Sequence, residues 1–442
     1  MNKNDIMAIL QDWNGWQKDF VTGVPRPTYL SKLIRFLHTN QITTIMGPRR
    51  AGKSYIMRQA AASLIKENID PKDILIVNFE DPRWPELDLK LLENIYQTYL
   101  EYIAPKGKPY IFLDEIQEIP KWEKWTRMMH ELSKAKMVVS GSNANLLSRE
   151  LGTVLTGRHL DLNVLPLSFR EFLTFNNMTL LNSVGLLGQA VEIRGLLRKY
   201  FEYGSFPEVV LNESKKEILL NYFEDIIEKD IIRRYRIRKA GGLKSLVKFY
   251  FSNPSAHVTF TSIAKFIKIS PDSVERFSGY LEGAYVVSLL KRFSFKVKEQ
   301  EKSPRKVYAV DTGLCNAVGF RFSENLGKLA KNLVFLELKR RQLDDPQLEI
   351  FYWKDGQERE VDFVIKHGLK VDRLIQVCWD VTELKTRERE IKSLLKASEE
   401  FAINKALVIT DDEESEEKIK GVLIKYIPLW KWLLFDEKEI EK

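Results

Sequence analysis

The chain contains little cysteine and no long apolar run. Only two of its 442 residues are cysteine, Cys315 and Cys378, which is too few for a disulfide framework and gives no metal-ligand spacing. This usage predicts a reducing, cytoplasmic location. No stretch approaches about 18 consecutive apolar residues, so we expect no transmembrane helix and no membrane partner. The first residues, Met1–Phe20, carry aspartates and two tryptophans without an apolar core, so they do not resemble a signal peptide.

Internal repeats and long low-complexity linkers are also missing from the sequence. A length of 442 residues predicts about three domains. The hydrophobic content of 44% and charged content of 29% are typical of a folded, soluble protein. The formal net charge of +8 favours a polyanionic partner, nucleic acid first, although solvated surface lysines produce the same excess.

The most informative pattern is a Gly-x-x-x-x-Gly-Lys-Ser stretch. It lies between an apolar run, Ile42–Met46, and a segment that favours helix, Tyr55–Ala60. In that context the glycines let backbone N–H groups turn toward phosphate oxygens, and the following helix adds partial positive charge. Lys53 is expected to reach the β- and γ-phosphates of ATP, and Ser54 to ligate Mg²⁺. We assign nine residues to the nucleotide site: Gly47, Pro48, Arg49, Arg50, Ala51, Gly52, Lys53, Ser54 and Tyr55.

Four further apolar runs are predicted to be buried strands, at 73–79, 109–115, 137–143 and 160–167. Strands that alternate with helices predict a parallel sheet covered on both faces, with the ligand at the carboxyl ends of the strands. At those ends Asp114 can hold Mg²⁺ opposite Ser54, and Glu115 can orient and deprotonate an attacking water. Asn143 either positions that water or senses the γ-phosphate, or simply forms a turn.

Three other polar residues have open assignments. Asn78 ends the second strand and either holds Glu115 inactive through a hydrogen bond or caps the backbone. Arg158 is the right residue type for an arginine finger, acting within its own chain or on a neighbouring subunit, and the alternative is a structural salt bridge. Arg26 precedes the first strand, where it either touches the nucleotide or is an ordinary surface arginine.

We predict four parts along the chain: a P-loop core at 1–167, a helical lid and connector at 168–232, a winged helix at 233–315, and an α/β domain at 316–442. Glycine and proline at 204–208 mark a loop between helices of the second part. Three amphipathic helices followed by strands at 286–295 and 306–310, joined by a charged turn, have the winged-helix layout. In the last part we expect a hairpin at 348–353 and 360–365, and a solvated loop and helix start in the acidic run 411–417.

Short strings in both halves carry a family resemblance. In the first half they are the loop at 47–54, Leu113–Gln117, Ser140–Ser142, Thr156–Arg158 and Pro166–Phe172. In the second half they are Gly204–Glu208, Arg305–Tyr308 with Asp311–Leu314, and Glu360–Phe363. Together these strings resemble archaeal and bacterial AAA-superfamily ATPases with a C-terminal domain of unknown function, from about residue 26 to 410. The resemblance implies an α/β fold class with an AAA-type parallel sheet, a helical lid, a winged helix and a tail of the PD-(D/E)xK nuclease fold.

The residues of the tail argue against an active nuclease. Such a site needs carboxylates for Mg²⁺ and a lysine beside the attacking water. Glu337 and Asp362 match the acidic positions, but the next strand offers Gln376 and Cys378 where an acid and a lysine are needed. Glutamine is a weak ligand for a hard cation, and cysteine cannot replace an ammonium group. We therefore expect a nuclease-shaped binding or docking module.

Two basic stretches favour a polyanion, at 233–239 and across the expected wing at 291–306, where Glu299 and Glu301 dilute the charge. Duplex DNA binding needs such clusters, although a winged helix can equally dock a protein. The sequence thus predicts a Mg²⁺-dependent ATP hydrolase or ATP-driven switch, with duplex DNA, a protein or further copies of the chain as candidate partners. One alternative is a nucleic-acid-binding regulator in which nucleotide is a structural ligand, and another is a PD-(D/E)xK-type nuclease.

Overall fold

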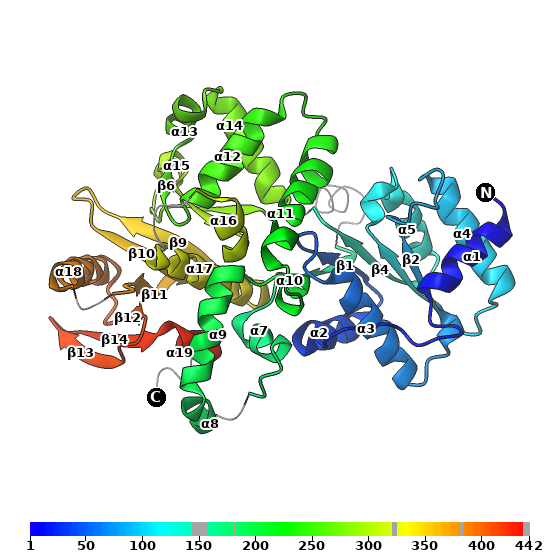
Figure 1. The fold of residues 1–442 in the computed structure, drawn as a ribbon, viewed down its shortest axis with the longest axis horizontal. Helices are drawn as coiled ribbons and strands as arrows, with labels where there is room; N and C mark the ends of the chain where they lie inside the picture. Colours follow the sequence, from blue (N-terminus) through cyan, green and yellow to red (C-terminus); the bar gives the residue numbers. More distant parts are fainter. Residues whose placement is uncertain (144–156, 181–182, 321–324, 381–382, 436–442) are drawn as a thin grey trace. The chain divides into compact units, whose positions relative to one another are not determined.

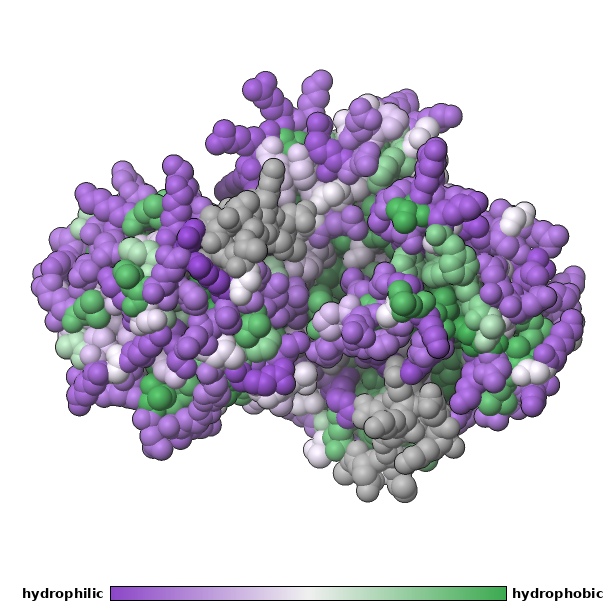
Figure 2. Space-filling model, turned by 180° about the vertical axis from the view of Figure 1, so that it is seen from behind, coloured by the Kyte–Doolittle hydropathy of each residue, from purple (hydrophilic) through white to green (hydrophobic). Residues whose placement is uncertain are grey.

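The computed structural model describes residues 1–143, 157–180, 183–320, 325–380 and 383–435. The chain divides into two compact units. The first comprises Met1–Leu165 and Gly283–Tyr285, and the second comprises Pro166–Glu282 and Val286–Lys442. Within the described ranges, no helix combines the length and the apolar character needed to cross a bilayer. Hydrophilic residues cover most of the face drawn in Figure 2.

The first unit is built on a five-stranded sheet in which every pair of neighbours is parallel, as predicted (Figure 1). The strand order is β2-β3-β4-β1-β5. The strands are β1 (Ile42–Met46), β2 (Ile74–Asn78), β3 (Tyr110–Asp114), β4 (Lys136–Gly141) and β5 (His159–Asn163). Because β1 lies between β4 and β5, the loop that leaves β1 opens at a point where the strand order reverses, which is where such sheets bind ligands.

Helices cover both faces of this sheet (Figure 1). In β2, Leu75 and Val77 pack with α1, α4 and α5, whereas Ile74 and Ile76 pack with α2 and α3. The helices are α1 (Lys3–Trp13), α2 (Pro27–Leu37), α3 (Lys53–Lys66), α4 (Leu89–Tyr102) and α5 (Trp122–Glu131). With both faces buried, each strand is a continuous apolar run, and for that reason the strands can be recognised in the sequence.

The second unit begins with helices and continues into two sheets. The helices that precede the sheets are α7 (Phe169–Phe175), α8 (Ser183–Gly188), α9 (Ala190–Tyr203), α10 (Pro207–Leu211), α11 (Lys215–Asp225), a π-helical segment (Ile226–Arg233) and α12 (Ala240–Ser252). A three-stranded antiparallel sheet, in the order β6-β8-β7, follows with its own helices. Its elements are β6 (His257–Val258), α13 (Phe260–Ile267), α14 (Pro271–Gly283), β7 (Val287–Leu290), α15 (Val297–Lys302) and β8 (Arg305–Ala309). The predicted charged turn between β7 and β8 therefore contains a short helix.

A six-stranded mixed sheet, in the order β13-β14-β12-β11-β10-β9, forms the C-terminal part of the second unit. Its elements and the helices around it are α16 (Thr312–Val318), α17 (Leu326–Asp344), β9 (Leu348–Lys354), β10 (Glu360–His367), β11 (Lys370–Val377), α18 (Leu384–Phe401), β12 (Lys405–Thr410), β13 (Ser415–Ile419), β14 (Val422–Pro428) and α19 (Leu429–Leu434). The predicted hairpin is confirmed as β9 and β10. The predicted helix start in the acidic run 411–417 is wrong, because Ser415–Ile419 is an edge strand, on which Glu416 is exposed and Glu417 pairs with Arg387.

The turn between α9 and α10 is fixed by a buried carboxylate. Asp311 accepts hydrogen bonds from the backbone N–H of Ser205 at 2.6 Å, from its hydroxyl at 2.8 Å, and from the Leu314 N–H at 3.0 Å. Gly204 has a φ of +76°, and a Cβ there would lie 2.0 Å from Asp311 Oδ1. The strings Gly204–Glu208 and Asp311–Leu314 thus form one structural joint inside the second unit.

Replacing Gly204 with alanine should therefore destabilise the second unit. The added methyl group meets both an unfavourable φ and the Asp311 carboxylate, and we expect a loss of roughly 2–4 kcal/mol in the free energy of unfolding. Gly195→Ala in α9 is the matched control, since no atom lies within 4 Å of its added Cβ and helical alanine is favourable. Thermal unfolding followed by circular dichroism measures both, and equal midpoints for the two variants would contradict the joint.

Candidate nucleotide site

The loop after β1 has the backbone shape that a phosphate cradle requires. It starts where β1 runs against the end of β5, with Val164 N–H donating to the Met46 carbonyl at 2.7 Å. A Cβ on Gly47 would lie 2.0 Å from the Val164 carbonyl oxygen, so no side chain is tolerated there. Gly52, directly before α3, has a left-handed φ of 96° that glycine adopts without strain.

Lys53 lies folded back over this loop. Its side chain is almost fully buried, and its ammonium group donates to the Gly47 carbonyl at 3.1 Å and the Pro48 carbonyl at 3.2 Å. The same ammonium is 3.4 Å from Glu115 Oε1. A buried charge needs such partners, and these oxygens supply them.

The carboxylates at the end of β3 lie beside the start of α3. Ser140, on the neighbouring strand β4, donates its hydroxyl to Asp114 Oδ1 and accepts the Glu115 N–H at 3.0 Å. Burial and the adjacent charge of Glu115 raise the pKa of Asp114, and hydrogen bonds from Ser140 and Ser54 oppose the shift. The predicted metal-ligand pair, Ser54 and Asp114, is therefore brought together by the fold.

Glu115 is held in an unusual backbone conformation, with φ 53° and ψ 46°. Non-glycine residues in this region cluster at functional sites, because the strain must be supported by the surroundings. Gln117 Nε2 donates to Glu115 Oε2 at 2.6 Å. Burial acts to raise the pKa of Glu115, but the charges of Lys53 and Arg49 outweigh it, so the pKa is lowered and the carboxylate is ionised at neutral pH.

Arg26 has a role that neither sequence alternative anticipates. It is 2% exposed, and its guanidinium donates to the Ala51 carbonyl at 2.8 Å and the Leu165 carbonyl at 3.0 Å. The guanidinium also lies 4.4 Å from the centroid of the Tyr29 ring. Arg26 therefore connects the phosphate loop to the chain segment after β5 through buried hydrogen bonds.

The other predicted residues occupy varied positions. Asn143 is fully buried just past the end of β4, next to the loop because Gly141 pairs with Met46. Asn78 accepts the Glu80 N–H at 2.9 Å and so caps the backbone, while Glu115 is bonded by Gln117 instead. Arg49 pairs with Glu80 at 2.6 Å, Arg50 has a left-handed φ of 67°, and Tyr55 is 46% exposed on α3.

Arg158 lies at the amino ends of strands β1 and β5, whereas the phosphate loop lies at the carboxyl end of β1. Its carbonyl accepts the N–H of Ile42, the first residue of β1, whereas the loop leaves the other end of that strand. A five-residue strand spans about 16 Å, so the guanidinium does not reach the loop of its own chain. The side chain is 41% exposed and pairs with Glu131 at 2.5 Å. An arginine finger within the same chain is excluded by this position.

Asp362, which matches an acidic position of the nuclease fold, is enclosed by lysines. Its fully buried carboxylate accepts hydrogen bonds from Lys306 at 2.9 Å and Lys331 at 2.7 Å, and from the Val377 N–H at 3.1 Å. Burial opposes ionisation, but the two lysines outweigh it and hold the pKa of Asp362 far below its usual range. Both ammonium groups bond to Oδ1 and the Val377 N–H bonds to Oδ2, so both oxygens of the carboxylate have partners within the protein.

The other predicted nuclease residues are also engaged in structural contacts. Gln376 accepts the Asp362 N–H at 3.0 Å and donates to Glu390, and Glu337 pairs with Arg340 and Arg341 at 3.5 Å each. Among the residues that the structure places, no group of three or more His, Cys, Asp or Glu side chains is arranged to hold a metal ion. These contacts give Gln376 and Glu337 structural roles in the second unit.

Part of the basic wing predicted from the sequence is paired with its own acids. Glu301 pairs with Lys291 and with Arg305, and Glu299 pairs with Lys296. Lys306 is 1% exposed and belongs to the Asp362 cluster, so its predicted role as a surface contact for DNA is wrong. A lysine on a strand with an inward-facing position looks the same in sequence as a surface lysine.

Three protein-family models match successive segments of the chain. The model of an AAA domain family matches residues 39–173, and two models described as domains of unknown function match residues 194–326 and 326–432. An uncharacterized protein of Methanocaldococcus jannaschii is 34% identical over 409 residues, covering 89% of this chain and 88% of that protein. An uncharacterized protein of Haemophilus influenzae is 29% identical, covering 92% of this chain and 98% of its own.

The first unit is therefore a P-loop domain of the AAA ATPase superfamily. The whole chain belongs to the family represented by the Methanocaldococcus jannaschii protein. Among solved structures, the Walker-type ATPase PABY2304 of Pyrococcus abyssi shares 13% identity, with a TM-score of 0.43 over 67% of this chain and 95% of its own. AMPPCP-bound DnaA from Aquifex aeolicus shares 15%, with a TM-score of 0.25 over 62% of this chain and 92% of its own.

The Asp362 cluster predicts a distinctive pH dependence for the variant Asp362→Asn. Removing the carboxylate leaves the buried Lys306 with Glu360 as its remaining carboxylate partner, and we expect the loss to cost about 3 kcal/mol at neutral pH. Because the pKa of Asp362 is lowered on folding, its contribution is present above about pH 4 and is lost as pH falls further. The difference in unfolding midpoint between wild type and variant should therefore shrink from pH 7 to pH 3. The exposed Glu416→Gln is the control, and a pH-independent difference would contradict the cluster.

Proposed function

We propose that the chain is a Mg²⁺-dependent ATP hydrolase that acts as a nucleotide-driven switch. The observation that carries this proposal is the placement of Glu115. Its backbone is strained, and its ionised carboxylate lies beside Lys53 at the ends of the strands where the phosphate loop begins. A purely structural nucleotide site has no need for a buried carboxylate at that point. Family membership supports nucleotide binding, and the carboxylate supports turnover.

Binding of ATP would exchange the internal contacts of Lys53 for phosphate oxygens. The Gly47 and Pro48 carbonyls now accept its hydrogen bonds, and a phosphate is a stronger partner for an ammonium group than a carbonyl. Loop N–H groups and the N-terminus of α3 would complete the cradle. The Ser54 hydroxyl and the Asp114 carboxylate are hard oxygen donors in contact, which suits Mg²⁺. Mg²⁺ bound there would neutralise charge that develops on the phosphates.

Glu115 would then orient the attacking water and accept its proton. Its lowered pKa keeps it ionised, and the hydrogen bond from Gln117 fixes the direction of the carboxylate. Asn143 is buried at the end of β4 next to the loop, where its amide would position the same water or sense the γ-phosphate.

We also propose the four-part division at 1–167, 168–232, 233–315 and 316–442. The order α12-β6-α13-α14-β7-β8 with a β6-β8-β7 sheet supports a winged helix at 233–315. Cys315 and Cys378 are both buried and are not joined in a disulfide, in keeping with a cytoplasmic location. Since Arg158 is distant from the loop of its own chain, its use as an arginine finger requires a homo-oligomer.

Lys53→Ala should abolish nucleotide binding, whereas Glu115→Gln should keep binding and stop turnover. The first change removes the phosphate contact and the second removes only the base for the attacking water. Titration with a fluorescent ATP analogue measures binding, and phosphate release at saturating Mg²⁺-ATP measures turnover.

Lys66→Ala, at the exposed end of α3, and Glu118→Gln, in the same turn as Glu115, are the matched controls. If both site variants hydrolysed ATP at the wild-type rate, the assignment would be wrong. If wild type showed no turnover with or without duplex DNA, nucleotide would be a structural ligand of a regulator.

Arg158→Ala should lower turnover by roughly 10³-fold, and mixing this variant with Lys53→Ala should restore part of it. Each variant supplies the group that the other lacks only if Arg158 acts on a neighbouring subunit. Arg127→Ala is the control, because it removes the other arginine that pairs with Glu131 and leaves Arg158 in place. If Arg158→Ala turned over ATP at the wild-type rate, Arg158 would not be an arginine finger, and its role would be the salt bridge to Glu131.

A further inference from the structure

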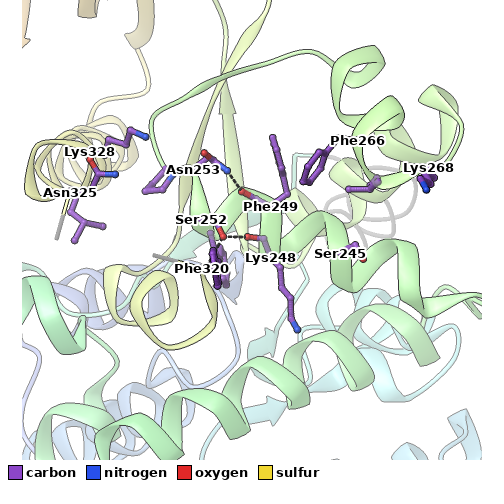
Figure 3. Close-up of a pocket in the computed structure, with 14 residues that line it drawn as sticks. Ser245, Lys248, Phe249, Ser252, Asn253, Phe266, Lys268, Phe320, Asn325 and Lys328 are labelled. Carbon is purple, nitrogen blue, oxygen red and sulfur yellow. Dashed lines mark hydrogen bonds between the residues drawn. The ribbon is translucent and has the colours of Figure 1, made fainter. Parts of the chain in front are cut away.

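The second unit contains a pocket that is separate from the phosphate loop. Its volume is about 730 Å³, within the range of small-molecule sites. It is formed by the last turns of α12 and the turn after them, the end of α13, and the start of α17 (Figure 3). All of these elements belong to the same unit. Neither the nucleotide site nor the Asp362 cluster contributes to its lining.

The lining of this pocket has one sign of charge. Lys248, Lys268 and Lys328 contribute to it, and none of the 14 described residues that line it is acidic. These three lysines form no ion pair with any residue that the structure places. In Figure 3 the Lys328 ammonium points toward Asn253, Lys248 extends away from the phenylalanine rings, and Lys268 lies on the opposite side of the view from Lys328. Such an arrangement attracts anions, with one cation inside and two at the edges.

Aromatic rings lie beside these cations. Phe266 and Phe320 both line the pocket and are 71% and 70% exposed. The ring of Phe249 is 5.4 Å from that of Phe266, centroid to centroid, and steadies it. The Phe320 N–H donates to Ser252 Oγ at 2.8 Å, which fixes the opposite rim. The pocket thus offers flat apolar surfaces within reach of free ammonium groups.

We propose that this pocket binds an unpaired nucleotide within a single-stranded nucleic acid. The base stacks on Phe266, and a phosphate of the same strand meets Lys328. Lys248 and Lys268, at the margins, contact the phosphates before and after it. Bases in a duplex are stacked on one another and cannot reach rings inside a pocket, whereas a free nucleotide has no neighbouring phosphates for the marginal lysines.

The test is the affinity of the full chain for fluorescein-labelled oligo(dT), measured by fluorescence anisotropy at low salt with EDTA and without ATP. Phe266→Ala should weaken binding by roughly 5- to 150-fold, the range measured for loss of one stacked base. Lys328→Gln should weaken binding and reduce the slope of log affinity against log salt by about 0.7, as expected for one lost phosphate contact.

Phe295→Ala and Lys298→Gln are the matched controls, since both residues are exposed on the second unit outside the pocket. Both should bind as wild type, and all variants should unfold at the wild-type midpoint. Failure of wild type to bind oligo(dT), or equal binding by pocket and control variants, would overturn the proposal. So would equal affinity for a duplex of the same length, or full displacement by thymidine monophosphate at the same nucleotide concentration. None of these outcomes depends on ATP hydrolysis.

Discussion

The buried charge of Lys53 is the interaction on which the nucleotide site depends. An ammonium group inside a protein must be satisfied, and here the loop carbonyls of Gly47 and Pro48, together with Glu115, do so. Those partners exist only because the loop curls tightly, with Gly47 against β5 and Arg26 behind Ala51. The shape of the loop and the position of the lysine therefore stabilise each other, and ATP would replace partners that are weaker than its phosphates.

The sequence predicts the parts of this site that are local and misses those that are distant. The phosphate loop, Ser54, Asp114 and Glu115 are recognisable because each follows a continuous apolar strand, and the parallel sheet places strand ends together. Arg26 contacts Leu165, 139 residues away, and Ser140 bridges to Asp114 on the adjacent strand. No periodicity signals such contacts. The contact of Gln117 with Glu115 is predictable from the sequence, since the two residues are two positions apart and a glutamine amide can donate to a carboxylate.

In the second unit, the predictions that fail most clearly are those about which charged side chains are exposed. The wing reads as basic, yet Glu301 and Glu299 pair with its cations, and Lys306 is buried against Asp362, 56 residues further along. Conversely, Lys248, Lys268 and Lys328 are scattered in sequence and meet only at the pocket. The fold thus pairs several cations of the wing with nearby acids and brings three other lysines to the pocket. In the same way, Asp362 is an ion-paired residue of the core.

The central claim is that Lys53 and the carboxylates beside it form the binding site for Mg²⁺-ATP. The most direct measurement is a structure of the full chain with a non-hydrolysable ATP analogue and Mg²⁺. We predict that Lys53 Nζ leaves the Gly47 and Pro48 carbonyls for the β- and γ-phosphates, with Mg²⁺ between Ser54 and Asp114 and the γ-phosphate facing Glu115. A nucleotide bound elsewhere, or bound with Lys53 still on the loop carbonyls, would contradict the account.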